Sequence, residues 1–203
     1  MSKYDTPENM CTALTTFIME MRMQVAAIRA YNNVFKDKLC DNIFLKRAYD
    51  SIWQELLSEI ARIFDKAYTG SNENCTLLRL KELCLKEQYS NVFLGGESNE
   101  LIKSLDSVIE FYSQLPVEKS RNKQLAHHDL KQVIAGNCIE ISLAQIELLI
   151  LNTTDVFSKI YTQFNLGWFE FSFSNYEKLV EQYENDILSV TNLTYSKTHS
   201  NIY

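Results

Sequence analysis

The amino-acid sequence predicts an all-α fold, and three observations lead to that prediction. Glycine and proline are scarce, at 5 and 2 of 203 residues, so few positions favour turns or interrupt a helix. Apolar residues recur three and four positions apart over long stretches, which places them on one face of a helix. No linker rich in serine, glycine or proline and no internal repeat divides the chain. We therefore expect a single helical domain over residues 1–190 and a mobile tail at 191–203, where the sequence offers little to bury.

The first two predicted helices form an antiparallel pair. Thr6 and Pro7 are typical of an N-cap and a first helical residue, so the first helix is expected to start there and to run to about Phe35. The second is expected from near Asp41 to Gly70-Ser71-Asn72, a string typical of a helix end. A short link between two such helices favours a helical hairpin. Their apolar faces comprise Met10, Leu14, Phe17, Ile18, Met21, Val25 and Ile28 in the first, and Phe44, Ala48, Ile52, Leu56, Ile60, Phe64 and Ala67 in the second.

Two further helices are expected in the middle of the chain. The first is short and has the apolar residues Leu77, Leu80, Leu83 and Cys84. A polar loop with Gly95-Gly96 separates it from a longer helix, for which Ser98 is the expected N-cap and Pro116 the expected end. The apolar face of the longer helix comprises Leu101, Ile102, Leu105, Val108, Ile109 and Tyr112.

The last two predicted helices both begin with the spacing of a capping box. Ser142 and Gln145 have this spacing ahead of a long apolar helix that Gly167 is expected to end. Residues 168–173 alternate apolar and polar side chains, as a short extended connector would. Ser174 and Glu177 repeat the capping-box spacing at the start of a last helix through Ile187.

Cysteine content and hydropathy limit the cellular setting that we expect. The five cysteines are scattered and include no CxxC pair, so the sequence indicates neither a zinc site nor a disulfide framework. The first nine residues lack the features of a secretory signal, and no apolar run reaches the length of a membrane span. We therefore expect a cytoplasmic protein with reduced thiols, no bound metal or cofactor and no contact with a membrane.

The richest cluster of reactive groups is the stretch Arg121–Asp129, RNKQLAHHD. Of the three histidines in the chain, His127 and His128 lie in this stretch and His199 lies near the C-terminus. An imidazole titrates near neutral pH, and an arginine supplies a permanent positive charge for a phosphate or a developing oxyanion. Because RNA has a 2′-hydroxyl beside each phosphodiester, one proton acceptor and one cation can suffice to cleave it. The candidate catalytic residues are therefore Arg121, Asn122, His127 and His128.

The charge distribution favours an enzyme over a general nucleic-acid-binding coat. The formal net charge is -6, whereas nonspecific affinity for nucleic acids depends on many contacts between cations and phosphates. Residues 117–131 nevertheless contain four basic and two acidic residues, a local balance of +2 on an acidic protein. The candidate RNA-binding cations beside Arg121 are Lys119, Lys123 and Lys131.

The string Arg121-Asn122-Lys123 followed by Ala126-His127 resembles the signature of HEPN domains. In that signature an arginine, usually followed by a polar residue, precedes a histidine by four to six intervening positions; five intervene before His127 and six before His128. The closer resemblance is to the HEPN branch linked to abortive phage infection. Three segments carry that likeness over roughly residues 41–164: Ile63-Phe64-Asp65, the short leucine-containing stretch Thr76–Leu83 and the motif Arg121–Asp129.

The resemblance implies an all-α, HEPN-like antiparallel helical bundle with extra C-terminal helices. It also implies a homodimer in which the two motifs face each other, and metal-independent endoribonuclease activity of a bacterial defence or toxin–antitoxin type. Arg121 would bind the phosphate, Asn122 would hold the phosphate or orient the imidazole, and His127 would transfer the proton. The expected product is a 2′,3′-cyclic phosphate, and the expected partners are RNA and an antitoxin or another defence protein.

Two alternatives remain open. On a regular helix a separation of six residues turns through about 600°, so His127 would lie about 120° from Arg121, whereas His128 would share the face of the arginine. His128 is therefore the second candidate for the proton transfer. The stretch also fits a solvated helix end, and HEPN domains include non-catalytic modules that bind RNA or regulate a partner protein.

Overall fold

Helices make up most of the part of the chain that the structure describes, so the all-α prediction is confirmed. The computed structural model describes residues 6–35, 42–86, 89, 96–120, 141–164, 166 and 173–199. Residues 117–120 are also helical, and the helices and strands in chain order are α1 Pro7–Phe35, α2 Ile43–Ile63, β1 Tyr68–Thr69, β2 Asn72–Glu73, α3 Leu77–Cys84, α5 Gly96–Gln114, α8 Leu143–Gln163 and α9 Phe173–His199.

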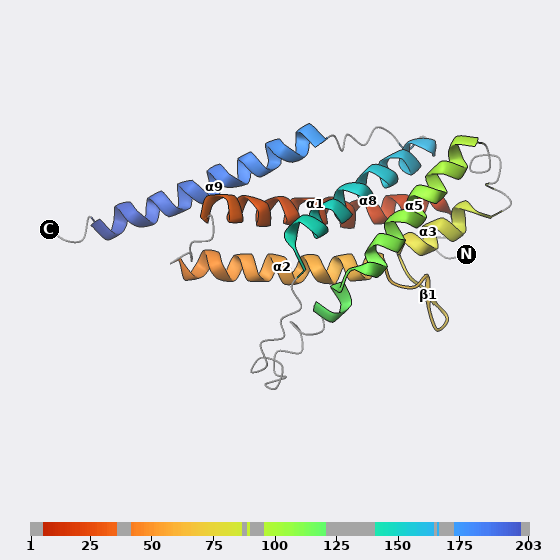
Figure 1. Cartoon of the computed structure of the whole chain (residues 1–203), viewed down its shortest axis with the longest axis horizontal. Coiled ribbons are helices and arrows are strands. Elements are labelled where there is room, and N and C mark those ends of the chain that lie inside the picture. The colour runs from red at the N-terminus through yellow and green to blue at the C-terminus, as the bar shows by residue number, and fades with distance from the viewer. Residues whose placement is uncertain are drawn as a thin grey trace.

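Helix α1 is the central element of the bundle. It runs antiparallel to α2 and packs against α3, α8 and α9, while α9 extends past the other helices toward the C-terminus (Figure 1). Its inner face is mostly apolar, because Met10, Leu14, Ile18 and Val25 recur at helical spacing and all are 0% exposed, although Arg22 is also buried. The helical hairpin expected from the sequence is therefore present, with α1 at its centre.

Helices α5 and α8 form a second antiparallel pair, and this pair positions the motif segment. They pack side by side, and α8 also packs against α1, so the end of α5 lies near the start of α8 (Figure 1). Residues 121–140, which contain the RNKQLAHHD motif, connect these two ends. The motif therefore leaves from, and returns to, the same side of the bundle.

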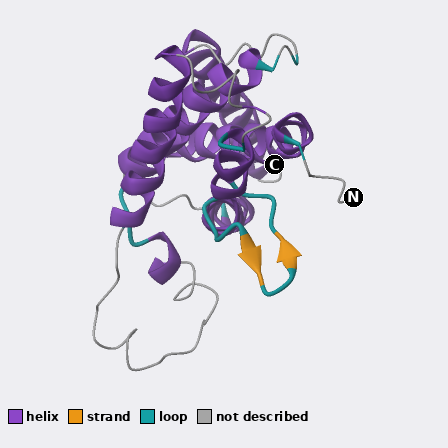
Figure 2. Cartoon of the chain, turned by 90° about the vertical axis from the view of Figure 1, so that its right-hand side faces the viewer, coloured by secondary structure: helices purple, strands orange, loops and turns teal. Residues whose placement is uncertain are grey.

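The end of α2 differs from the sequence-based prediction. The helix ends at Ile63, with Phe64 as its C-cap, and not at Gly70-Ser71-Asn72. The strands β1 and β2 form an antiparallel hairpin that projects from the helices (Figure 2), with Gly70 in its turn at a φ of 62°. Asn74 stabilises this hairpin, because its side chain donates hydrogen bonds to the Lys66 carbonyl (2.9 Å) and to the Thr69 hydroxyl (2.8 Å). The glycine that looked like a helix end thus serves a tight β-turn.

The capping-box spacing in the sequence predicts a helix start correctly only where the structure contains the capping hydrogen bonds. The Ser142–Gln145 capping box at the start of α8 is confirmed. By contrast, α5 and α9 begin at Gly96 and Phe173, so Ser98 and Ser174 lie inside these helices and are not their N-caps. Serine has enough helical propensity to lie in the first turn of a helix when the residues before it are also helical.

The ends of α8 and α9 also differ from the expected positions. Helix α8 stops at Gln163, before the expected Gly167. Gly167 lies outside the described residues, together with residues 168–172 of the expected connector. Helix α9 continues through residues 191–199, which the sequence pattern assigned to a tail. No glycine or proline occurs after Gly167, so nothing in the local sequence forces this helix to stop.

Candidate functional site

The structure describes the two flanks of the motif but not the motif itself. Among the predicted site residues, Lys119 is described, and it is exposed on the helical turn at 117–120. The other predicted site residues all lie outside the described residues, and they are Arg121, Asn122, Lys123, His127, His128 and Lys131. Their roles and their mutual distances therefore stay predictions.

The turn that leads into Arg121 is fixed to the core by one face. Pro116 breaks the chain direction after α5, and a new helical turn starts with a 2.9 Å hydrogen bond from the Ser120 N–H to the Pro116 carbonyl. Val117 and Ser120, at 0% and 4% exposure, point inward, whereas Glu118 and Lys119 are exposed. The chain thus enters the motif from an anchored position with a lysine on the solvent side.

An aromatic stack joins the end of α2 to the last turn of α5, just before this turn. The rings of Phe64 and Tyr112 lie 4.4 Å apart with an interplanar angle of 12°, and both residues are buried. Phe64 belongs to the Ile63-Phe64-Asp65 string, and Tyr112 lies one turn before Pro116. The first of the three segments that carry the family likeness therefore contacts α5, the helix that precedes the motif segment in the chain.

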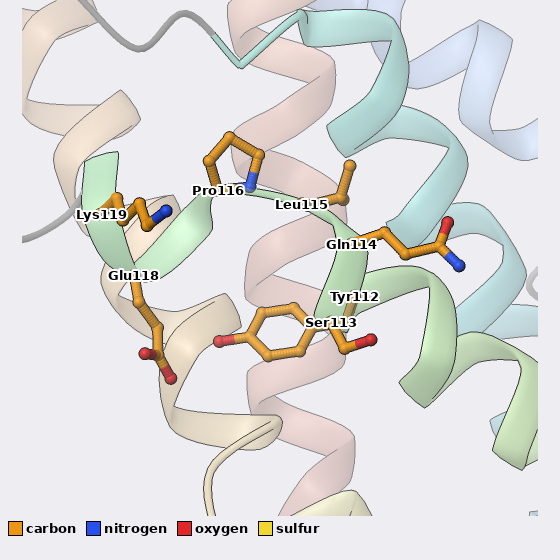
Figure 3. Close-up of a pocket in the computed structure, with 7 residues that line it drawn as sticks. All are labelled: Tyr112, Ser113, Gln114, Leu115, Pro116, Glu118 and Lys119. Carbon is orange, nitrogen blue, oxygen red and sulfur yellow. The ribbon is translucent and has the colours of Figure 1, made fainter.

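A surface cavity of about 400 Å³ opens at the same corner (Figure 3). Its lining includes Tyr112, Gln114, Pro116, Glu118 and Lys119. The Tyr112 and Glu118 side chains lie on one side of the turn, whereas the Gln114 amide points the opposite way (Figure 3). The residues that line the cavity therefore include an aromatic residue, an amide and charges of both signs, shortly before Arg121 in the chain.

The other flank of the motif is held by a polar cluster that the sequence analysis missed. Arg29 Nη1 on α1 binds Glu147 Oε1 on α8 at 2.7 Å and Glu177 Oε1 on α9 at 2.9 Å. The hydroxyl of the fully buried Tyr176 donates to the same Glu147 oxygen at 2.7 Å. Burial, followed by the hydrogen bond to Glu147, raises the pKa of Tyr176, which keeps the hydroxyl protonated as a donor.

This cluster fixes the start of α8, where the motif segment returns to the bundle. Glu147 lies in the second turn of α8 and is held by groups from both α1 and α9. Arg29 is 118 positions and Tyr176 is 29 positions away from Glu147 in the chain. No local spacing marks such a contact, so sequence patterns could not have found it.

The described residues show no metal centre and no membrane-spanning helix. Within the described ranges, no three histidine, cysteine, aspartate or glutamate side chains come together as metal ligands would. No described helix has the combination of length and apolar character that crossing a bilayer demands.

An all-α bundle with an Arg-Asn-Lys-x-x-Ala-His segment between two antiparallel helices defines a protein of the HEPN superfamily. A family model supports this assignment, because the AbiU2 model of HEPN proteins matches residues 10–187. The chain therefore belongs to the AbiU2 family, in the abortive-infection branch of the superfamily. The match extends from α1 into α9 and includes the whole motif segment. Comparisons with curated proteins and with solved structures gave no match.

Proposed function

We propose that this protein is a metal-independent endoribonuclease of a bacterial defence or toxin–antitoxin system. The observation that carries the proposal is the Arg121–His128 motif in a chain that belongs to the AbiU2 family. The structure supports it by anchoring both flanks of the motif, through the buried face of the 117–120 turn and through the Glu147 cluster. Catalytic groups need such fixed flanks, because small displacements of reacting groups lower the rate strongly.

The proposed reaction uses the 2′-hydroxyl of RNA as its nucleophile. His127 or His128 accepts the hydroxyl proton, the oxygen attacks the neighbouring phosphorus, and the bond to the 5′-oxygen of the next nucleotide breaks. The guanidinium of Arg121 stabilises the additional negative charge on the phosphorane, and Asn122 holds the phosphate or the imidazole. The leaving oxygen takes up a proton, and the products are a 2′,3′-cyclic phosphate and a 5′-hydroxyl end.

A homodimer would complete the proposed site. Each chain contributes one motif arginine, so a two-fold axis near the motif would place two guanidinium groups in one cleft. Lys119 supports this arrangement as an exposed cation at the entry to the motif, and Lys123 and Lys131 are its proposed counterparts within the 121–140 segment. An antitoxin or another partner of the defence system would control access to such a cleft in the cytoplasm.

The first test is RNA cleavage in the presence of EDTA. We expect the wild-type protein to cut single-stranded RNA and the products to have the mass of a 2′,3′-cyclic phosphate. Arg121→Ala should lower the rate at least about 100-fold, because it removes a charge that acts on the transition state. Lys103→Ala is the matched control, since Lys103 is an exposed cation on α5 away from the motif. Binding of RNA without turnover by the wild-type protein would instead support the non-catalytic module.

A second test separates the two histidines. His127→Ala and His128→Ala, measured singly in the same assay, should show that one histidine is essential and that the other is not. We expect the larger loss for His127, by the family pattern. Full activity of both single variants would remove histidine from the mechanism.

A further inference from the structure

The cavity at the end of α5 has a size and a lining that suit a small planar ligand. Its volume of about 400 Å³ lies within the usual range of small-ligand pockets, about 300–1,000 Å³. Leu115 and Pro116 contribute apolar surface to it, and Tyr112 contributes an aromatic ring. Phe64 holds that ring in place, because the two rings are stacked at 4.4 Å. A flat, partly apolar ligand therefore has a fixed surface to lie against.

Two opposite charges border the cavity from the helical turn at 117–120. Glu118 and Lys119 both line it, and both residues are exposed. The hydroxyl end of the Tyr112 ring points toward the turn that carries them (Figure 3). Among the residues that the structure describes, neither Glu118 nor Lys119 has an ion-pair partner. The carboxylate and the ammonium are therefore both available to a ligand.

These two groups limit the chemistry of a matching ligand. A carboxylate only accepts hydrogen bonds, through two oxygens, and an ammonium only donates them. Guanine is the RNA base with two adjacent donors on its Watson–Crick edge, the N1–H and the N2 amino group. Adenine, cytosine and uracil have an acceptor beside a donor on that edge, and a carboxylate repels the acceptor. A phosphate supplies the anion for the ammonium, so a guanine nucleotide matches both charges.

We propose that this cavity binds a guanine nucleotide of single-stranded RNA. The Glu118 carboxylate accepts hydrogen bonds from the N1–H and the N2 amino group of guanine, and the Lys119 ammonium binds a phosphate of the same nucleotide. The RNA is single-stranded because pairing would cover the Watson–Crick edge. Arg121 follows Lys119 by two residues, so the cavity adjoins the motif in the chain. The proposal rests on the proposed function, since it gives the ribonuclease a preference for guanine beside the cleaved bond.

Nucleotide binding tests the proposal without any cleavage. The four nucleoside 5′-monophosphates are titrated separately into the wild-type protein, and chemical-shift changes in ¹⁵N NMR spectra give their affinities. We expect GMP to bind at least about fivefold more tightly than AMP, CMP or UMP, which is the lower limit for a bidentate contact to a base. Equal affinities for the four nucleotides, or no binding of GMP at millimolar concentration, would overturn the proposal.

The Glu118→Gln variant should change the base preference in a definite direction. The glutamine amide offers one acceptor and one donor, a pair that adenine matches and guanine does not. We expect the affinity for GMP to fall at least about fivefold and the preference to move toward AMP. Glu110→Gln is the matched control, since Glu110 is exposed on α5 and lies outside the described lining of the cavity. An unchanged preference for GMP in Glu118→Gln would overturn the proposal.

The Lys119→Ala variant tests the phosphate contact. It should weaken the binding of GMP and leave the binding of guanosine unchanged, because guanosine has no phosphate. Lys103→Ala is the matched control, since Lys103 is an exposed cation on α5 outside the described lining, and it should change neither affinity. Equal losses for GMP and guanosine would contradict a contact between Lys119 and the phosphate.

Sequencing of the cleaved RNA separates this proposal from the proposed function. The wild-type protein should cut a mixed-sequence RNA beside guanine, and Glu118→Gln should lose that preference. Cleavage that requires Arg121 but occurs equally beside all four bases would overturn the role of the cavity and leave the ribonuclease activity supported. Binding of GMP through Glu118 by a protein that cuts no RNA would support the cavity as a nucleotide site and contradict the proposed ribonuclease.

Discussion

At the residue scale, Phe64 shows how one side chain connects distant parts of the chain. It ends α2, stacks on Tyr112 of α5 and belongs to the buried core. Its hydrophobic character could be read from the sequence, but its partner could not, because Phe64 and Tyr112 are 48 residues apart and no periodicity links them. The stack thus joins the end of α2 to the last turn of α5.

Removal of the Phe64 ring should destabilise the whole domain. We expect Phe64→Ala to lower the free energy of unfolding by about 3 kcal/mol, since truncation of a buried phenylalanine removes apolar burial and leaves a cavity. Chemical unfolding followed by circular dichroism measures this change. Phe44→Ala is the control on the same helix, because Phe44 is 72% exposed and its loss should cost little. Equal effects of the two substitutions would contradict the buried position of Phe64.

The thiols of Cys11 and Cys84 report on the packing of α1 against α3. Both are 0% exposed, and burial raises the pKa of each thiol, that of Cys84 to about 12. We expect neither thiol to react with iodoacetamide at pH 8 in the folded protein, because the thiolate is the nucleophile. Peptide mass spectrometry after alkylation checks this, with the half-buried Cys75 as the internal comparison. Modification of Cys11 or Cys84 as fast as Cys75 would mean that α3 does not pack on α1 in this way.

At the element scale, the start of α8 shows a local signal and a tertiary contact acting together. The Ser142–Gln145 capping box could be recognised from its spacing, and the structure confirms it. Glu147 lies in the second turn of α8 and accepts hydrogen bonds from Arg29 and Tyr176. No local sequence rule predicts these contacts. The helix therefore starts where its own sequence directs, but its orientation depends on α1 and α9.

Loss of the cap should weaken the start of α8. We expect Ser142→Ala to lower the free energy of unfolding by about 1 kcal/mol, because the backbone N–H of Gln145 loses its acceptor. Ser104→Ala is the matched control, since the Ser104 hydroxyl donates to the Glu100 carbonyl within a helix and caps nothing. Urea unfolding of both variants gives the comparison. If the cap stabilises α8, Ser142→Ala should lower the free energy of unfolding more than Ser104→Ala does.

At the scale of the whole molecule, the buried core and the motif belong to different parts of the chain. The core joins α1, α2, α3, α5, α8 and α9, while the motif lies in a connection between the ends of two of these helices. The charge is also unevenly distributed. The formal net charge of the chain is -6, whereas the basic residues gather around the motif.

The sequence alone determined the all-α class, the extent of α1, the short helix α3, the capping box of α8 and the family to which the chain belongs. These features depend on local spacing and on a contiguous motif, both of which can be read along one chain. Only the tertiary structure decided that α2 stops at Ile63, that Phe64 meets Tyr112, and that Arg29, Glu147 and Tyr176 form one cluster. The physical reason is that such contacts join residues far apart in sequence, where packing and burial outweigh local preference.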